Sequence, residues 1–544
     1  MIPSMPRFLL ALLLLPCGLC GAEPVVIPTF HSLGLYWSPK GGDKGRQVLV
    51  RYRAAGEGAW QEALPLRFHP ISKTKEDLAD YRGSIVHLEP GSEYQVELKL
   101  EGTTKRAEMK ARTWREHFPE GEVVRVGSRR SPLEITESGL PDAWRVIDGR
   151  GATLDMRHEH DACITVDASY VILRGFTLRG AGRNGEDLQR IIGAITILGG
   201  HDIVIEDCDI ADWGRHNPET GFGRDYDAAI FSRDQNVARL IVQRCLLHHP
   251  AEDANHWHEP EYPTHPEGPQ CITLFNSAGN HVIRYNECWS DPEHRFNDII
   301  GGGDNGSFRG SPGPDSDIYG NVLRDCWDDG LEVEGGGRNV RVWGNYVTQA
   351  VNMIANAATS IGPLYIWGNV TGRCQATPEL PGYSFLKMGN AGGEKWMTGL
   401  QYIFHNTVFD EDGWLPSGGL GGDRIVKHAT SRNNLLPIRS ERDPMVSSAE
   451  ENKGNDFDYD LTNGRVPEEM QRHGIHGLPR YAKGSGFDPA TRTGRFQLTP
   501  DSPGAAVGQP IPNFTPTYSG PAPDFGAHQR GAPPLRFGVP AATR

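Results

Sequence analysis

The chain has 544 residues, with 55 Lys or Arg and 69 Asp or Glu, giving a formal net charge of −14. This length predicts more than one domain, and the acidic balance excludes the basic surface with which proteins bind nucleic acid. Beyond the first residues no stretch approaches the ~20 apolar residues of a membrane span, so we expect no membrane insertion. We also expect a monomer.

Residues 1–22 have the pattern of a secretory signal peptide. Arg7 precedes a short apolar run at residues 8–15, and small residues precede Glu23, as in signals removed on export. Cys20 is a candidate for a lipid anchor, but Gly18-Leu19 before it is a poor match to a lipobox. We predict a secreted or periplasmic protein.

Residues 24–115 alternate apolar and polar side chains in short runs separated by turns, which predicts a small β-sandwich. The segment Leu88-Glu-Pro-Gly-Ser-Glu-Tyr94 has the Leu-x-Pro-x-x-x-Tyr pattern of a fibronectin type III corner. With Trp37 in an early strand and Trp114 at the end, the segment resembles that family. The resemblance implies that the Tyr94 hydroxyl bonds nearby backbone and that the module folds independently, as a spacer or docking surface.

An asparagine recurs behind short alternating strands in residues 120–440. Asn321, Asn345 and Asn369 follow each other at 24 residues, with Asn286 before them and Asn406 and then Asn433 or Asn434 after them. A repeat of this period predicts a solenoid, and Asn fits tight turns, so we expect an internal amide ladder. The pattern resembles the pectin-lyase-like superfamily of polysaccharide-active proteins, which implies an all-β chain with a right-handed parallel β-helix.

Each coil of the predicted solenoid carries a recurring first strand, beginning near residues 194, 229, 271, 299, 331, 353 and 385. Polar insertions at 212–226, 248–269 and 301–316 interrupt the repeat, and such insertions gather on one face, often the binding face.

Seven of the nine cysteines lie beyond the signal. Cys208 and Cys245 occupy equivalent positions in successive coils, where they form either two stacked core thiols or a disulfide.

Acidic residues concentrate where these strands begin. Aligning the coils places Asp298 and Asp329 at equivalent positions, with Asp227 and Gln270 near the same column within one residue. Parallel strands lie ~4.8 Å apart, so the carboxylates repel and one pKa should rise, which makes a general acid. We assign catalysis to Asp298, Asp329 and Glu332. The sequence leaves both the ~5 Å separation of a retaining glycosidase and the ~6.5–9.5 Å of an inverting one open.

The same oxygens also suit calcium, for which we name Asp304, Asp328 and Glu334, and acidic turns are also ordinary in solenoids. Lys387 falls in the Glu332 column two coils further on. The resemblance implies lyases in which a Lys or Arg removes the proton beside a uronate, so Lys387 is a fourth candidate catalytic residue.

Residues 248–259 offer histidines and acids, but their spacing matches no standard zinc motif. We interpret this loop as a wall of the site, because an aromatic ring gives sugars a flat apolar contact. Substrate binding is assigned to Trp257, His256, Arg295 and Trp327.

Residues 445–544 lose the repeat and become rich in Pro, Gly and Asp. A solenoid exposes an open edge at its end and needs a cap, so we expect this tail to pack back on the coils.

These features predict a secreted enzyme acting on a polysaccharide, first of all a glycoside hydrolase that requires no cofactor. A calcium-assisted polysaccharide lyase using Lys387 is the first alternative. A non-catalytic glycan-binding or adhesin-like protein, with the solenoid as a rod, is the second.

Overall fold

The structure, a computed structural model, describes residues 23–56, 58–71, 78–183, 190–261, 264–376, 382–389, 393–422 and 424–542. The predicted signal peptide lies outside these residues. The regular elements of the described chain are strands, apart from the short 3-10 helices η1 (Glu394–Trp396), η2 (Glu450–Asn452) and η3 (Val539–Ala542). Within those ranges, no helix is long and apolar enough to cross a membrane.

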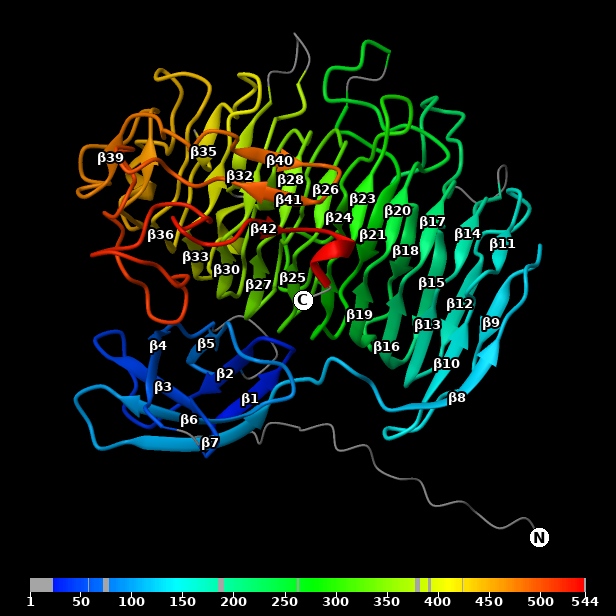
Figure 1. The fold of residues 1–544 in the computed structure, drawn as a ribbon, viewed down its shortest axis with the longest axis horizontal. Coiled ribbons are helices and arrows are strands. Elements are labelled where there is room, and N and C mark those ends of the chain that lie inside the picture. Colours follow the sequence, from blue (N-terminus) through cyan, green and yellow to red (C-terminus); the bar gives the residue numbers. More distant parts are fainter. Residues whose placement is uncertain are drawn as a thin grey trace.

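The N-terminal module is an antiparallel β-sandwich beside the solenoid (Figure 1). All seven strands contribute to one apolar core around Trp37, so the sheet folds over itself. Tyr94 closes the predicted corner, because the Glu89 backbone N–H donates to its hydroxyl at 2.9 Å. The strands, in the order β1-β2-β5-β4-β3-β6-β7, are β1 (Val25–Pro28), β2 (Leu33–Trp37), β3 (Gln47–Ala54), β4 (Gln61–Phe68), β5 (Tyr81–Ile85), β6 (Glu93–Leu100) and β7 (Arg106–Arg112).

The rest of the chain coils into the predicted right-handed parallel β-helix, with three faces (Figure 1). The long sheet contains β8 (Glu120–Arg125), β10 (Trp144–Asp148), β13 (Val171–Arg174), β16 (His201–Glu206), β19 (Ala238–Gln243), β22 (Val282–Arg284), β25 (Asp317–Tyr319), β27 (Val340–Trp343), β30 (Leu364–Trp367), β33 (Gln401–Phe404), β36 (Ala429–Arg432) and β37 (Asp456–Phe457). The second sheet contains β11 (Thr153–Asp155), β14 (Thr177–Arg179), β17 (Asp209–Ala211), β20 (Leu246–His248), β23 (Glu287–Trp289), β26 (Val322–Arg324), β28 (Tyr346–Thr348), β31 (Val370–Thr371) and β34 (Thr407–Val408).

The third face consists of two sheets joined by single bridges, Ile300 to Leu331 and Glu332 to Ala355. The coil between them, at residues 329–335, pairs with its neighbours through isolated bridges and not through a regular strand. Its strands are β9 (Leu133–Ile135), β12 (Ile164–Asp167), β15 (Gly193–Gly199), β18 (Ala228–Ser232), β21 (Gln270–Leu274) and β24 (Ile300–Gly301), followed by β29 (Ile354–Asn356), β32 (Ser384–Met388) and β35 (Gly418–Leu420).

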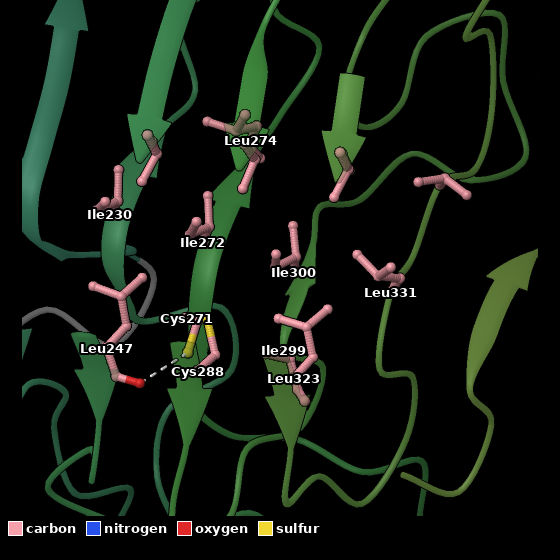
Figure 2. Close-up of a cluster of buried hydrophobic side chains, with 14 of the residues drawn as sticks. Ile230, Leu247, Cys271, Ile272, Leu274, Cys288, Ile299, Ile300, Leu323 and Leu331 are labelled. Atoms are coloured by element: carbon pink, nitrogen blue, oxygen red, sulfur yellow. Dashed lines mark hydrogen bonds between the residues drawn. The ribbon is translucent and has the colours of Figure 1, made fainter. Parts of the chain in front are cut away.

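Apolar side chains stack in columns inside the coils. Ile230, Ile272, Ile300 and Leu331 follow one another from coil to coil (Figure 2). The seven cysteines beyond the signal are all buried and free, so Cys208 and Cys245 are core thiols and not a disulfide.

The predicted asparagine ladder runs along one turn of the solenoid. The Asn321 side-chain amide donates to Asn345 Oδ1 at 2.9 Å, Asn345 donates to Asn369 at 3.0 Å, and Asn369 donates to Asn406 at 3.1 Å. Each oxygen also accepts the backbone N–H of the preceding rung, as Asn345 Oδ1 does from Asn321 at 3.1 Å. The series starts at Asn286 and continues through Asn434 to an aspartate, Asp460, whose Oδ1 accepts the last amide at 2.7 Å.

The sandwich covers the outer side of the long sheet. Tyr36 donates to Asp315 at 2.7 Å, and Thr29 donates to Asp317, which also forms a fully buried ion pair with Arg341. Removing the module would expose these buried charges, so it contributes to the stability of the solenoid. Its independent folding stays a prediction.

The tail covers the second sheet and returns to the sandwich. Phe487 stacks on Tyr346 with ring centroids 4.1 Å apart, and Asn513 donates to the Tyr52 hydroxyl at 2.7 Å. The outer side of the third face is contacted by two of the insertions, through Asn305 and His265. The strands β38 (Leu461–Thr462) and β39 (Ile475–His476) pair in parallel and continue the second sheet, because Leu461 bridges Leu435 of the preceding coil. The solenoid therefore runs past residue 445, and the antiparallel strands of the tail are β40 (Gly486–Asp488), β41 (Thr493–Arg495) and β42 (Leu535–Arg536).

Replacing Asn345 by Leu should destabilise the fold by several kcal/mol, because it leaves buried partners in Asn321 and Asn369 unpaired at about 1–3 kcal/mol each. Denaturant unfolding measures the loss. The exposed Asn236→Leu is the matched control and should stay within about 0.5 kcal/mol of the wild type. Equal stability of the two variants would contradict a structural role for the ladder.

Candidate active site

The register of the third face brings the predicted acidic column together. Ile272, Ile300 and Leu331 pair in succession, so the residues two positions earlier, Gln270, Asp298 and Asp329, lie in one column. Asp227 is displaced by one residue, since Ala228 pairs with Gln270. The Asp227 carboxylate instead binds Arg215 at 2.9 Å.

A second column on the same face contains Glu332 and Lys387, both paired with Ala355 between them. Glu332 and Glu334 alternate with Leu331 and Val333, which point into the core. Both glutamates therefore point away from the core.

Asp298 and Asp329 are held by short contacts. Asp298 accepts the Asp329 backbone N–H at 3.0 Å and the Gln270 amide at 2.9 Å. Asp329 accepts the Asn352 amide at 3.0 Å on one oxygen, and its other oxygen lies 2.5 Å from Lys387 Nζ. Lys387 thus forms an ion pair that joins the second column to the first.

Glu332 and Glu334 complete the cluster. Glu332 accepts the Gly302 backbone N–H at 3.1 Å and the Asn305 amide at 2.7 Å. Gly301 leaves room for this carboxylate, because a Cβ there would lie 2.9 Å from Glu332 Oε2. Glu334 accepts the Ala357 N–H at 2.8 Å through one oxygen. Within the described residues its Oε2 is buried and accepts no hydrogen bond.

Two of the three insertions contact the cluster. Asn305 comes from the insertion at 301–316, and His265 comes from that at 248–269, with its Nε2 3.1 Å from Asp328 Oδ2. The carboxylates are not open to solvent as expected of a groove: Asp298, Asp329 and Glu332 are 4, 0 and 6 % exposed. Lys387, with its side chain 14 % exposed, is the more accessible group.

Burial and mutual repulsion shift the protonation of these acids. Burial and the Asp328 charge raise the pKa of Asp329 to about 7, against the opposing effect of Lys387. Burial raises the pKa of Glu334 to about 8, and burial with neighbouring carboxylates raises those of Asp298 and Glu332. Asp328 is the exception, because Lys387 and His265 outweigh its burial and lower its pKa.

The cluster suits a hard divalent cation. Ligand oxygens of Asp298, Asp328 and Asp329 lie within 4.8 Å of one another, as do those of Asp329, Glu332 and Glu334. Calcium takes six to eight oxygen ligands, and the unbonded Glu334 Oε2 is an oxygen available for one. Asp304, also predicted as a ligand, lies apart from these groups: it is exposed and accepts the Asn276 amide.

The predicted substrate-binding residues pack on one another beside Asp328. The Arg295 guanidinium lies 4.6 Å from the Trp327 ring, and His256 lies 5.1 Å from it on centroids. Trp327 is 5 % exposed, so it presents no free face to a sugar. Trp257 is half-buried against His265.

Sequence reasoning missed Asn352, His265 and Asn305. Asn352 could have been predicted from the sequence repeat, because it occupies the position that pairs with Asp329 of the preceding coil. His265 and Asn305 lie in insertions that carry no periodic signal.

Comparison with known proteins adds little to this geometry. No family model and no curated protein matches the chain. Among solved structures, a pectate lyase, PelI from Erwinia chrysanthemi, matches at 8 % identity and a TM-score of 0.22, over 84 % of this chain and 99 % of that one. The class of fold, a parallel β-helix, therefore rests on the strand pairing described above.

Raising the pH from 5 to 8 in the presence of a chelator should lower the melting temperature by a few degrees. Asp329 and Glu334 have folded-state pKa values of about 7 and 8, against ordinary values of 3.8 and 4.5. The folded protein thus holds more protons than the unfolded chain across this window, and its stability falls as they are released.

Glu334→Gln removes one of these charges and should flatten the pH dependence measured by thermal unfolding. Glu108→Gln on the exposed side of β7 is the control and should follow the wild type. An unchanged slope in Glu334→Gln would show that this carboxyl is already ionised in the folded protein at pH 5.

Proposed function

We propose that this protein is a calcium-assisted polysaccharide lyase that cleaves a uronic-acid polymer by β-elimination, with Lys387 as the base. The observation that carries the proposal is the position of Lys387, whose Nζ lies 2.5 Å from Asp329 and 3.8 Å from Asp328 at the edge of a buried carboxylate cluster. A glycosidase places two carboxyl groups on either side of the bond and has no need of an amine between them.

In this proposal the residues of the cluster have three roles: binding calcium, positioning Lys387 and removing the proton. Asp298, Asp328, Asp329, Glu332 and Glu334 would hold the calcium ion, which when bound supplies positive charge beside the substrate carboxylate. Asp329 also fixes the Lys387 side chain, and Asn352 fixes Asp329 at 3.0 Å. Burial lowers the pKa of Lys387, but the charges of the neighbouring carboxylates outweigh it and raise that pKa. The amine can therefore act as a base only where those charges are compensated, as a bound cation would do. Lys387, the more exposed of the group, would then take the proton from the carbon next to the uronate carboxyl.

In this reaction the C–H electron pair forms a C4=C5 double bond while the C4–O bond breaks. The departing oxygen carries away the electron pair and is protonated from solvent or a neighbouring acid. The product is an unsaturated sugar, and no water is consumed.

A glycoside hydrolase is the second candidate, supported by the raised pKa of Asp329, to about 7, and of Glu334, to about 8. Carboxyl groups that hold a proton at neutral pH can act as general acids. Here Asp298, Asp329 and Glu332 would supply the acid and its partner. A purely adhesive rod gains nothing from burying these charges.

Incubation with a panel of neutral and acidic polysaccharides should give rising ultraviolet absorbance on a uronate polymer, lost on chelation and restored by calcium. Lys387→Gln keeps a hydrogen-bond donor beside Asp329 but removes the amine that would take the proton. It should fold normally by circular dichroism and lose about 10²–10⁴-fold in rate.

Lys427→Gln is the control, because Lys427 also forms an ion pair with a carboxylate, Glu394 at 2.5 Å, and it should keep full activity. New reducing ends without ultraviolet absorbance, resistant to chelation, would favour the hydrolase. Binding without either signal would favour the non-catalytic alternative.

A further inference from the structure

Two aromatic side chains stand exposed beside the strand that carries Lys387. Among the described residues, the exposed large apolar side chains include Tyr383, at 37 %, and Trp414, at 38 %. Tyr383 directly precedes β32, and Trp414 lies in the turn before β35, the next strand of the third face (Figure 1). The two turns stack, because the Ser417 hydroxyl donates to the Tyr383 carbonyl at 2.8 Å. One exposed apolar residue needs no explanation, but these two rings lie on adjacent coils next to the proposed base.

Tyr383 belongs to the column of Asp328. The backbone N–H of Val351 donates to the Asp328 carbonyl at 3.1 Å, and the Tyr383 N–H donates to the Val351 carbonyl, also at 3.1 Å. Tyr383 therefore lies two coils beyond Asp328, on the side of the solenoid where the acidic cluster lies. Lys387 follows it by four residues, which is at most ~14 Å of extended chain.

The insertion at 248–269 connects Tyr383 to the cluster. The Trp257 ring lies 6.5 Å from that of Tyr383, with an interplanar angle of 89°, and 4.6 Å from that of His265, on centroids. His265 in turn contacts Asp328 at 3.1 Å. Within the described residues the Tyr383 hydroxyl has no hydrogen-bond partner. Both the ring and its polar end are therefore available to a ligand that reaches Lys387.

A cation accompanies the second ring. The Arg373 guanidinium lies 4.8 Å from the centre of the Trp414 ring. Glu411 of the same turn accepts the Tyr346 hydroxyl at 2.8 Å on one oxygen and the backbone N–H of Arg373 at 3.4 Å on the other. Within the described part of the chain the Arg373 guanidinium forms no ion pair, so its charge is available to an anionic ligand beside Trp414.

We propose that Tyr383 and Trp414 bind further sugar units of the uronic-acid polymer, which then runs from Lys387 along the solenoid axis toward the C-terminal coils. This inference rests on the substrate class of the proposed function. An aromatic ring offers the C–H face of a pyranose a flat apolar contact, and the Arg373 guanidinium can pair with a uronate carboxylate. Tyr383 takes a unit near Lys387, and Trp414 takes one at least a coil, ~4.8 Å, further on. Short substrates therefore reach Tyr383 but not Trp414.

The first test measures cleavage by the full chain, with calcium, on polygalacturonate and alginate and on size-fractionated oligomers of the polymer that is cleaved. Trp414→Ala should raise KM on the polymer about fivefold to tenfold at unchanged kcat. On the shortest oligomer that is cleaved, its KM should equal that of the wild type. Tyr383→Ala should raise KM on both substrates, and circular dichroism should be unchanged in both variants.

Trp60→Ala is the matched control, because Trp60 on the sandwich also packs against arginine side chains, with Arg51 and Arg53 at 4.7 and 4.6 Å from its ring. It should keep the wild-type KM. A wild-type KM on the polymer in both Tyr383→Ala and Trp414→Ala would overturn the proposal. So would an equal rise for Trp414→Ala on the polymer and on the shortest oligomer.

Affinity electrophoresis separates this inference from the lyase activity. The Lys387→Gln protein should be retarded in gels that contain polygalacturonate or alginate, and less in gels that contain neutral dextran. Adding Trp414→Ala should weaken the retardation. Retardation that depends on Trp414, with no cleavage by the wild type, would reject the lyase and keep the binding surface. Retardation that Trp414→Ala leaves unchanged would reject the binding surface even where cleavage is found.

Discussion

The amide ladder is the constraint on which the rest of this molecule depends. From Asn321 to Asn434 each rung accepts two hydrogen bonds on its side-chain oxygen and donates at least two from its amide, so each coil can meet the next in one register. A slip of one residue would turn every side chain of a strand to the opposite face. The column that joins Asp298 to Asp329, and the one that joins Glu332 to Lys387, exist because the turns between the sheets are held in step.

The acidic cluster shows what such a rigid frame permits. Five carboxylates and one ammonium lie on adjacent coils, largely out of contact with water, an arrangement that opposes folding unless the charges are compensated. Protonation compensates part of it, and Lys387 compensates another part. A bound cation would do so more completely, which links the chemistry of the face to the stability of the coils beneath it.

The periodic part of this structure could be predicted from the sequence, and the aperiodic part could not. Asn321, Asn345 and Asn369 repeat at a fixed spacing, so the fold, the ladder and the Asp298–Asp329 column followed from counting. The role of Asp460 in the ladder was not predicted, because an aspartate takes the place of the repeating asparagine at this end. His265 and Asn305 lie on insertions whose path depends on distant contacts. The burial of Trp327 depends on Ala254 and Val351, which no local pattern associates with it.

The contacts of the two chain ends have a consequence for how the whole molecule unfolds. A bare solenoid is held by nearest-neighbour interfaces and can fray coil by coil from either end. Here the sandwich forms hydrogen bonds to Asp315 and Asp317 of the middle coils, and Asn513 of the tail forms a hydrogen bond to the sandwich. Chain segments far apart in sequence thus tie together coils that do not touch one another. The array should lose the gradual melting of a linear repeat and open as one cooperative unit.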